Sequence, residues 1–170
     1  MRKTGLVAIL LLSTGPAVAQ ESSCADPQYH ALDFWLGHWN VFDTRSGSRA
    51  GESLIEKAYG GCVVRENWSE PGFTGGSFNI YSRIDRKWHQ TWVDSSGATR
   101  EFVGSAGHGA AVLVARTFVH DDPMKPVEVR ISLNANHDGS VRQYSNYSRD
   151  GGRTWRLRYD YTYRRKPGGS

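Results

Sequence analysis

Apolar and polar residues alternate along most of the chain with a period of two, and this period is typical of half-buried β-strands. Over 87–94, Trp88 and Trp92 fall on one face, whereas His89 and Thr91 fall on the other. Over 154–163, one face is expected to carry Trp155, Leu157, Tyr159, Tyr161 and Tyr163. One face of each strand is therefore aromatic and the other solvated, as in antiparallel sheets.

Turns marked by Gly, Pro, Asn and Asp divide the chain into about ten such strands. They are expected near residues 38–44, 52–59, 62–69, 76–83, 87–94, 99–104, 110–120, 127–135, 140–148 and 154–163. All connections have hairpin length, and none could hold a crossover helix. We therefore expect an all-β fold, a closed antiparallel up-and-down barrel of about ten strands, because closure removes the sheet edges. A sandwich is the alternative.

One short helix is expected before the strands. Asp26 and Pro27 are typical of a helix start, and the apolar residues that follow recur at helical spacing. Gly37 would end this helix, because glycine adopts a positive φ without steric penalty. Trp39 would then bury its ring at the floor of the barrel.

The first residues have the features of an export signal. Arg2 and Lys3 are basic, residues 6–12 are apolar, and Ala17–Ala19 has the small residues of a cleavage site. The apolar run is too short to span a bilayer. We expect a signal peptide over 1–19, cleaved after Ala19, and a secreted, most simply periplasmic, protein.

The rest of the chain is expected to be a single barrel domain over 20–163, followed by a flexible basic tail over 164–170. Without the two basic residues of the signal peptide, 19 basic residues face 17 acidic ones. Three of these 19 lie in the tail. The charge is therefore too small to indicate a nucleic-acid partner, and no transmembrane segment is expected.

Two cysteines, Cys24 and Cys62, remain in a compartment where thiols oxidise. We expect them to form one disulfide that fixes the N-terminal segment to an early strand. A metal site is less expected, because neither cysteine has a nearby Cys or His partner.

Four motifs carry a resemblance to a known family: 34–39 (Phe-Trp-Leu-Gly-x-Trp), 61–68, 77–81 and 87–94. Together they resemble an uncharacterised family of secreted bacterial domains with a lipocalin-like, or calycin-like, barrel. The resemblance covers 30–163, nearly all of the chain after the signal peptide. It implies the barrel fold and secretion, and it brings no substrate, because none is established for that family.

Several polar side chains are expected inside the barrel, among aromatic ones. The candidate ligand-binding residues are Glu66, Trp68, Asn79, Gln90, Trp92 and Gln143. Barrels of this size hold one small ligand between apolar walls and a few orienting polar groups. The alternative is a filled core in which these groups satisfy each other. The direction of Ser77 and Asn79 is open, since Phe78 and Ile80 compete for the same interior.

Three classes of function follow from this pattern. The first is a barrel that binds a small amphipathic or hydrophobic ligand. The second is a cofactor-free enzyme of the isomerase, cyclase or hydrolase type, with Glu66 as acid or base. The third is an interaction module that uses exposed Trp and Tyr side chains. The ligand and the oligomeric state are not determined by the sequence.

No metal or cofactor is expected. The histidines are His30, His38, His89, His108, His120 and His137, and none is two or four residues from another. His120 falls in an expected turn. Calycin-like barrels that bind haem use a histidine on a late strand, and residues 140–163 contain none.

Residues 148–155 (Ser-x-Asp-x-Gly-x-Thr-Trp) match the Asp-box pattern of sialidase hairpins. In that pattern the Ser and Asp side chains fix a turn and the Trp packs beneath it. A single copy cannot make a propeller, which needs several blades. We expect a structural hairpin without a catalytic role.

Overall fold

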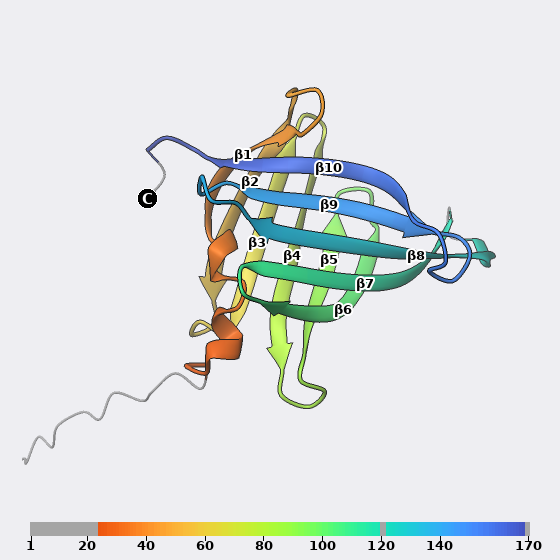
Figure 1. Ribbon diagram of the computed structural model, residues 1–170, viewed down its shortest axis with the longest axis horizontal. Helices are drawn as coiled ribbons and strands as arrows, with labels where there is room; N and C mark the ends of the chain where they lie inside the picture. The colour runs from red at the N-terminus through yellow and green to blue at the C-terminus, as the bar shows by residue number, and fades with distance from the viewer. Residues whose placement is uncertain (1–23, 120–121, 169–170) are drawn as a thin grey trace, which may run out of the picture.

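The computed structural model describes residues 24–119 and 122–168 and is a closed barrel of ten antiparallel strands (Figure 1). Each strand pairs with its neighbour in sequence, and the last strand pairs with the first. The expected all-β barrel is confirmed. The signal peptide and the turn at His120 lie outside the described residues. Within the described part of the chain, no helix is both long and apolar enough to cross a membrane.

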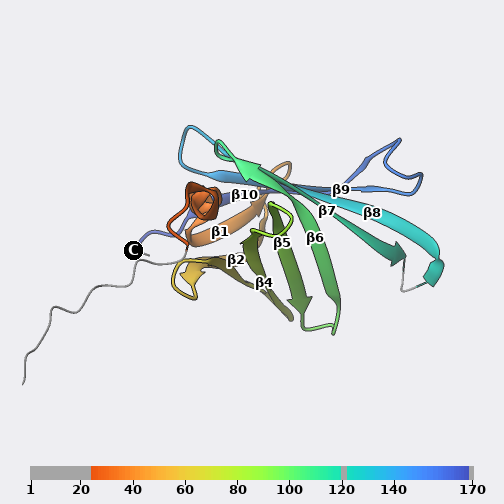
Figure 2. The same ribbon diagram turned by 90° about the horizontal axis from the view of Figure 1, so that it is seen from below.

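The element bounds agree closely with the strands expected from the alternation. Two 3-10 helices, η1 (Pro27–His30) and η2 (Asp33–Trp35), precede the barrel. The strands are β1 (Gly37–Asp43), β2 (Arg49–Ala58), β3 (Val63–Glu70), β4 (Phe73–Ser82), β5 (Lys87–Asp94), β6 (Thr99–Gly107), β7 (Ala110–Val119), β8 (Asp122–Ala135), β9 (Val141–Ser148) and β10 (Arg156–Arg165). Figure 2 shows the two helical turns at one end of the barrel, beside the start of β1.

The helical segment differs from the single helix expected. Asp26 caps η1 as predicted, since its Oδ1 accepts a hydrogen bond from the Gln28 amide at 2.9 Å. Leu32, with φ −102° and ψ 6°, interrupts the helical backbone, and η2 ends at Trp35. Gly37 is therefore not a helix stop. It opens β1 with φ +143°, where a Cβ would lie 2.6 Å from Arg165 Nη1.

Trp39 closes one end of the barrel, as the sequence predicts. Its side chain is fully buried, and its Nε1 donates to the Trp35 carbonyl oxygen at 2.9 Å. Tyr163 makes edge-to-face contacts with both indoles, at centroid distances of 6.2 Å to Trp35 and 6.3 Å to Trp39. These three buried rings, which we call the aromatic plug, pack together at the end of the barrel where the helical turns lie. Figure 1 shows the helical turns at that end.

The expected disulfide is present between Cys24 and Cys62, with the Cα atoms 5.1 Å apart. It joins the segment before η1 to the turn that leads into β3. Lys57 adds a second link between the same regions, because its Nζ donates to the Tyr29 carbonyl oxygen at 2.7 Å and pairs with Asp33 at 2.6 Å. The segment of η1 and η2 is thus held to the barrel covalently and by hydrogen bonds.

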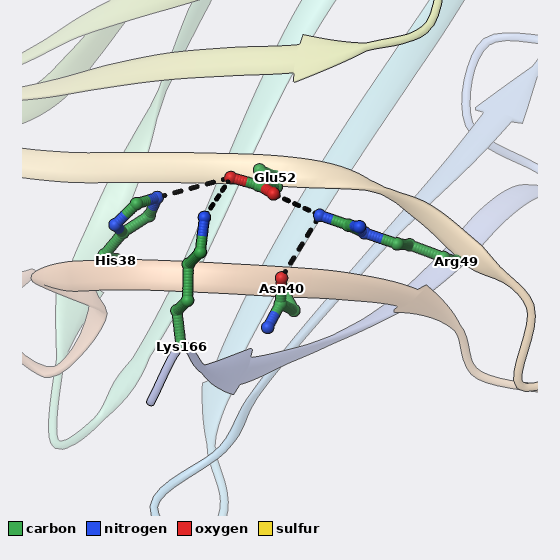
Figure 3. A network of polar contacts seen from close by, with 5 residues as sticks. All are labelled: His38, Asn40, Arg49, Glu52 and Lys166. Atoms are coloured by element: carbon green, nitrogen blue, oxygen red, sulfur yellow. Dashed lines mark hydrogen bonds and ion pairs between the residues drawn. The ribbon is translucent and has the colours of Figure 1, made fainter. Parts of the chain in front are cut away.

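Strand β10 continues to Arg165, two residues beyond the boundary expected for the barrel. The backbone of the next residue, Lys166, donates to the His38 carbonyl oxygen at 2.8 Å. Its Nζ donates to Glu52 Oε2 at 2.8 Å, and the carboxylate also contacts His38 at 3.5 Å and the Arg49 guanidinium (Figure 3). This network ties the start of the tail across β1 to β2, on the outer surface of the barrel.

The 148–155 hairpin has the structure expected from its Asp-box pattern. Asp150 Oδ1 accepts a hydrogen bond from the Thr154 amide at 2.9 Å, and Ser148 Oγ accepts one from the Gly152 amide at 2.8 Å. Trp155 Nε1 donates to the Gly152 carbonyl oxygen at 3.0 Å, and the Arg130 guanidinium lies over the indole at 4.3 Å. Hydrogen bonds from Thr154 lower the pKa of Asp150 to about 2. The motif stabilises the turn.

The strict alternation expected over 154–163 is wrong at one position. The register of β10 against β9 shifts between Leu157 and Tyr159, which marks a β-bulge. Leu157 is consequently half-exposed rather than inward, while Tyr163 keeps its inward position. The extra residue is Arg158, which the bulge brings to the mouth of the barrel.

Candidate functional site

The barrel contains a cavity of about 350 Å³ that opens at the end opposite the aromatic plug. Its mouth is formed near the β3–β4 and β5–β6 turns, by residues such as Phe73 and Ser96. Antiparallel hairpins alternate between the two ends of a barrel, and the plug lies beside the β2–β3 turn, at the other end. The volume falls at the lower end of the range of about 300–1,000 Å³ that holds small ligands.

Six aromatic side chains line the cavity above its deep end, and we call them the aromatic wall. They are Trp68, Phe73, Trp92, Phe102, Tyr159 and Tyr161. Three of them stack in series across β1 and β2: the centroids of Trp68 and Tyr161 are 5.9 Å apart, and those of Tyr161 and Tyr159 are 4.7 Å apart. The interplanar angles are 11° and 18°, so the rings are nearly parallel.

Two glycines make room for the indoles of this wall. A Cβ on Gly51 would lie 2.7 Å from Trp68 Cζ2, and a Cβ on Gly75 would lie 2.5 Å from Trp92 Cζ2. Each indole therefore lies flat over the backbone of the neighbouring strand. Neither glycine was among the predicted site residues, although a glycine inside a strand is a known signal of such close approach.

The deep end of the cavity, which we call the polar floor, is built around Glu66. This carboxyl group is buried, with 3% of the residue exposed. Ser53 Oγ on β2 donates to Glu66 Oε1 at 3.2 Å, and Ser77 Oγ on β4 donates to Oε2 at 3.0 Å. Each carboxyl oxygen thus has one hydroxyl donor from a neighbouring strand and keeps capacity to accept another hydrogen bond.

Asn79 and Gln90 extend the polar floor along β4 and β5. Asn79 Nδ2 donates to the Val64 carbonyl oxygen and to Ser77 Oγ, both at 3.0 Å. Gln90 Nε2 donates to Asn79 Oδ1 at 2.8 Å. Gln90 Oε1 is buried and has no hydrogen-bond partner. Because Gln90 lines the cavity, this oxygen is an acceptor that a ligand could satisfy.

Gln143 and Tyr163 complete the polar floor from the opposite side of the barrel. Tyr163 Oη donates to Gln143 Oε1 at 2.5 Å, and both side chains line the cavity. Burial raises the pKa of the Tyr163 and Tyr159 hydroxyls, and the nearby Glu66 raises both further. The two tyrosines are therefore neutral donors at ordinary pH.

Burial also raises the pKa of the Glu66 carboxyl, from its ordinary 4.5 to about 7. The hydrogen bonds from Ser77 and Ser53 oppose this shift but do not cancel it. A carboxyl group with a pKa near neutrality could change its protonation state on ligand binding or in a proton transfer.

This raised pKa predicts that the free protein loses stability as the pH rises. Between about pH 4.5 and 7, Glu66 is ionised in the unfolded chain and protonated in the folded one, so the folded state binds the extra proton. We expect the contribution of this group to the free energy of unfolding to decrease by about 2 kcal/mol from pH 5 to pH 8. Urea unfolding of wild type and Glu66→Gln at both pH values measures this contribution.

The Glu66→Gln variant keeps a hydrogen-bonding side chain that does not titrate. Its stability relative to wild type should therefore increase from pH 5 to pH 8. A difference between the two proteins that is the same at both pH values would contradict the raised pKa.

The mouth of the cavity carries charges of both signs. Glu70, Asp94, Arg100 and Arg158 line it together. Asp94 also holds an aromatic wall residue in place, because its Oδ2 accepts a hydrogen bond from Trp92 Nε1 at 2.9 Å. The mouth therefore balances two acidic and two basic groups, whereas the hydrogen bonds that Glu66 accepts at the polar floor come from serine hydroxyls.

The structure brings five of the six candidate residues to the cavity: Glu66, Trp68, Gln90, Trp92 and Gln143. Asn79 is buried behind them and uses its amide to position Ser77 and Gln90. The open question about this strand is resolved, because Ser77 and Asn79 point inward while Phe78 and Ile80 are 42% and 40% exposed.

Other cavity residues were not among the candidates. Phe73, Phe102, Val129, Ile131 and Ser145 are inward-facing strand residues whose place at the cavity depends on strand pairing. Arg100 and Arg158 carry charges that suggest an outward face, and no sequence signal marked them. The alternation pattern could have supplied Phe102 and the inward tyrosines.

Three of the described histidines each contact a carboxylate. His30 contacts Asp33 at 2.8 Å, and His89 contacts Asp85 at 2.8 Å. In residues 24–119 and 122–168, no group of three or more His, Cys, Asp or Glu side chains is arranged to hold a metal ion. His120 lies outside these residues.

The closed barrel fits the fold implied by the resemblance in the sequence, without showing the family. The chain matches no protein-family model, and no curated protein is found to be similar to it in sequence.

Proposed function

We propose that the protein binds one small amphipathic ligand inside the barrel. The observation that carries this proposal is the cavity of about 350 Å³, which combines an aromatic wall with buried polar groups at its deep end. Such a cavity buries the apolar body of a ligand, while a few polar groups fix its orientation. The barrel fold that the resemblance implies is compatible with such a ligand.

Two further features support ligand binding over a filled core. The mouth includes exposed residues, Ser96 and Arg158, so the cavity communicates with solvent. Gln90 Oε1 remains without a partner although its neighbours satisfy one another. The disulfide is compatible with a periplasmic or extracellular protein, where such bonds persist, and secretion is part of the proposal.

Binding of a neutral fluorescent probe, N-phenyl-1-naphthylamine, tests the proposal. Its emission increases in apolar surroundings, and its two joined aromatic units fit the volume of the cavity. Val129→Trp should obstruct the site, because Val129 is buried and lines the cavity. We expect the Kd of the probe to increase at least tenfold in this variant.

Val112→Trp is the matched control. Val112 lies on β7, is 43% exposed and does not line the cavity, so the same substitution should leave the Kd within about twofold of wild type. Equal effects of the two substitutions, or no probe binding to the wild type, would contradict binding in the barrel.

A cofactor-free enzyme of the isomerase, cyclase or hydrolase type is the second candidate. The raised pKa of Glu66 favours it, because a general acid or base works best when its pKa is near the working pH. Under this alternative, Glu66 would exchange a proton with a substrate held against the aromatic wall. Turnover by wild type that is lost in Glu66→Gln would distinguish an enzyme from a binding protein.

A further inference from the structure

We propose that the occupant of the cavity is a small organic cation, with a protonated amine at the polar floor and an aromatic or aliphatic body against the aromatic wall. Glu66 is the counter-ion of this amine. The inference rests on the proposed binding function and names the chemical class of its ligand.

Among residues 24–119 and 122–168, no ion pair joins Glu66 to a basic side chain. Its hydrogen-bond donors are Ser53 on β2 and Ser77 on β4. The titratable groups near it on β10 are Tyr159 and Tyr163, which stay neutral. An ionised carboxylate buried without a positive partner is costly, whereas one paired with a cation is compensated. A cationic ligand supplies this missing partner.

Charge is distributed unevenly along the cavity, and this distribution also favours a cation. At the mouth, Glu70 and Asp94 are balanced by Arg100 and Arg158. At the floor, Glu66 is the acidic residue, and the other polar groups are amides and hydroxyls. The deep end therefore becomes negative when Glu66 ionises, and it favours a positive group over a neutral or negative one.

A hydrogen-bond acceptor without a partner, Gln90 Oε1, lies near Glu66. Gln90 is 1% exposed, lines the cavity and leaves Oε1 without a partner. Ser77 Oγ connects the two side chains, because it donates to Glu66 at 3.0 Å and accepts from Gln90 Nε2 at 3.4 Å. An ammonium group has three N–H donors and can serve both Glu66 and Gln90, whereas a ligand hydroxyl has one.

The aromatic wall also favours an organic cation. Trp68, Tyr161 and Tyr159 stack in series at the side of the cavity, and Trp92 and Phe102 line it from β5 and β6. Indole and phenol rings attract organic cations through their π-electrons, most strongly where water is excluded. The same rings bury the apolar body of the ligand. The wall and the carboxyl group thus favour the same class of molecule.

Calorimetric titration with two matched indoles tests the inference. Tryptamine carries an alkylammonium group, which stays protonated at pH 8, and tryptophol replaces it with a neutral hydroxyl. At pH 8, where Glu66 is mostly ionised, tryptamine should bind at least tenfold more tightly than tryptophol. At pH 5.5, protonation of Glu66 should weaken tryptamine binding about tenfold or more and leave tryptophol nearly unchanged.

Glu66→Gln should reduce the tryptamine preference at pH 8 to below about threefold, with circular dichroism confirming that the variant is folded. If this variant does not fold, the pH dependence of the wild type remains a complete test. Equal affinities for the two indoles, or no tryptamine binding at pH 8, would overturn the inference.

A preference that survives in folded Glu66→Gln, or that does not change with pH, would also overturn it, since the amine would then sit elsewhere. The proposed function fails separately. The cation inference could be overturned while the neutral naphthylamine probe still binds and Val129→Trp still blocks it. The protein would then be a barrel that binds another class of ligand.

Discussion

Replacing Trp39 with alanine is expected to lower the free energy of unfolding by about 3–5 kcal/mol. The side chain is fully buried, and its ring centroid lies 6.3 Å from that of Tyr163. The Arg165 guanidinium carbon lies 4.6 Å from the centroid of the Trp39 ring. Its removal would also leave the Trp35 carbonyl oxygen without the indole donor. This loss is a large part of the ~5–15 kcal/mol by which a domain is stable. Urea or guanidinium melts monitored by circular dichroism measure it.

His38→Ala is the control, since it truncates a ring one residue away on the same strand. The His38 side chain is one-third exposed and contacts the surface carboxylate of Glu52 at 3.5 Å. Exposed ion pairs contribute little, so this variant should lose well under ~1 kcal/mol. Similar losses in the two variants would mean that Trp39 does not close the barrel.

Gly104→Ala is expected to lower the free energy of unfolding by about 3 kcal/mol, at the upper end of the usual cost of overpacking. A Cβ at this position would lie 1.9 Å from the Val112 carbonyl oxygen and 2.8 Å from Leu113 Cα. Both atoms belong to the backbone of β7, so the strand itself must move. The displacement would disturb the β6–β7 pairing, in which Gly104 faces Leu113. Denaturant melts and the yield of folded protein report this loss.

Gly107→Ala is the matched control on the same strand, because a Cβ at Gly107 would meet nothing within 4 Å. This change should be neutral or slightly stabilising, since alanine restricts the unfolded chain more than glycine does. If the two alanine variants were equally stable, the close approach of β7 to Gly104 would not constrain the barrel.

The sequence predicted the strands well because the burial pattern of a barrel strand is local. Each strand has one face inside and one outside, so alternation alone places Trp88, Gln90 and Trp92 on the inner face. The N-terminal plug and the disulfide were also predictable, from Trp39 and from the pair of cysteines in a chain that is expected to be exported.

The parts that the sequence did not predict depend on contacts between strands. The β-bulge that turns Leu157 outward is a property of the β9–β10 pairing. The position of Asn79 behind the cavity depends on its bonds to Val64 and Gln90, on two other strands. Whether the interior is filled depends on the summed volumes of inward side chains from all ten strands, which no local pattern contains.

The order of the strands also constrains how this chain can fold. Neighbouring hairpins form from residues close in sequence, but the barrel closes only when β1 pairs with β10, with Trp39 opposite Arg165 near the two ends of the described chain. Closure of so long a loop is entropically costly, and folds dominated by such non-local pairing form slowly. Until β1 and β10 pair, both are free edges, each able to pair with another copy of the chain. The contacts of Lys166 with His38 and Glu52 therefore act at the step that ends this period of exposure, by fastening the last strand to the first.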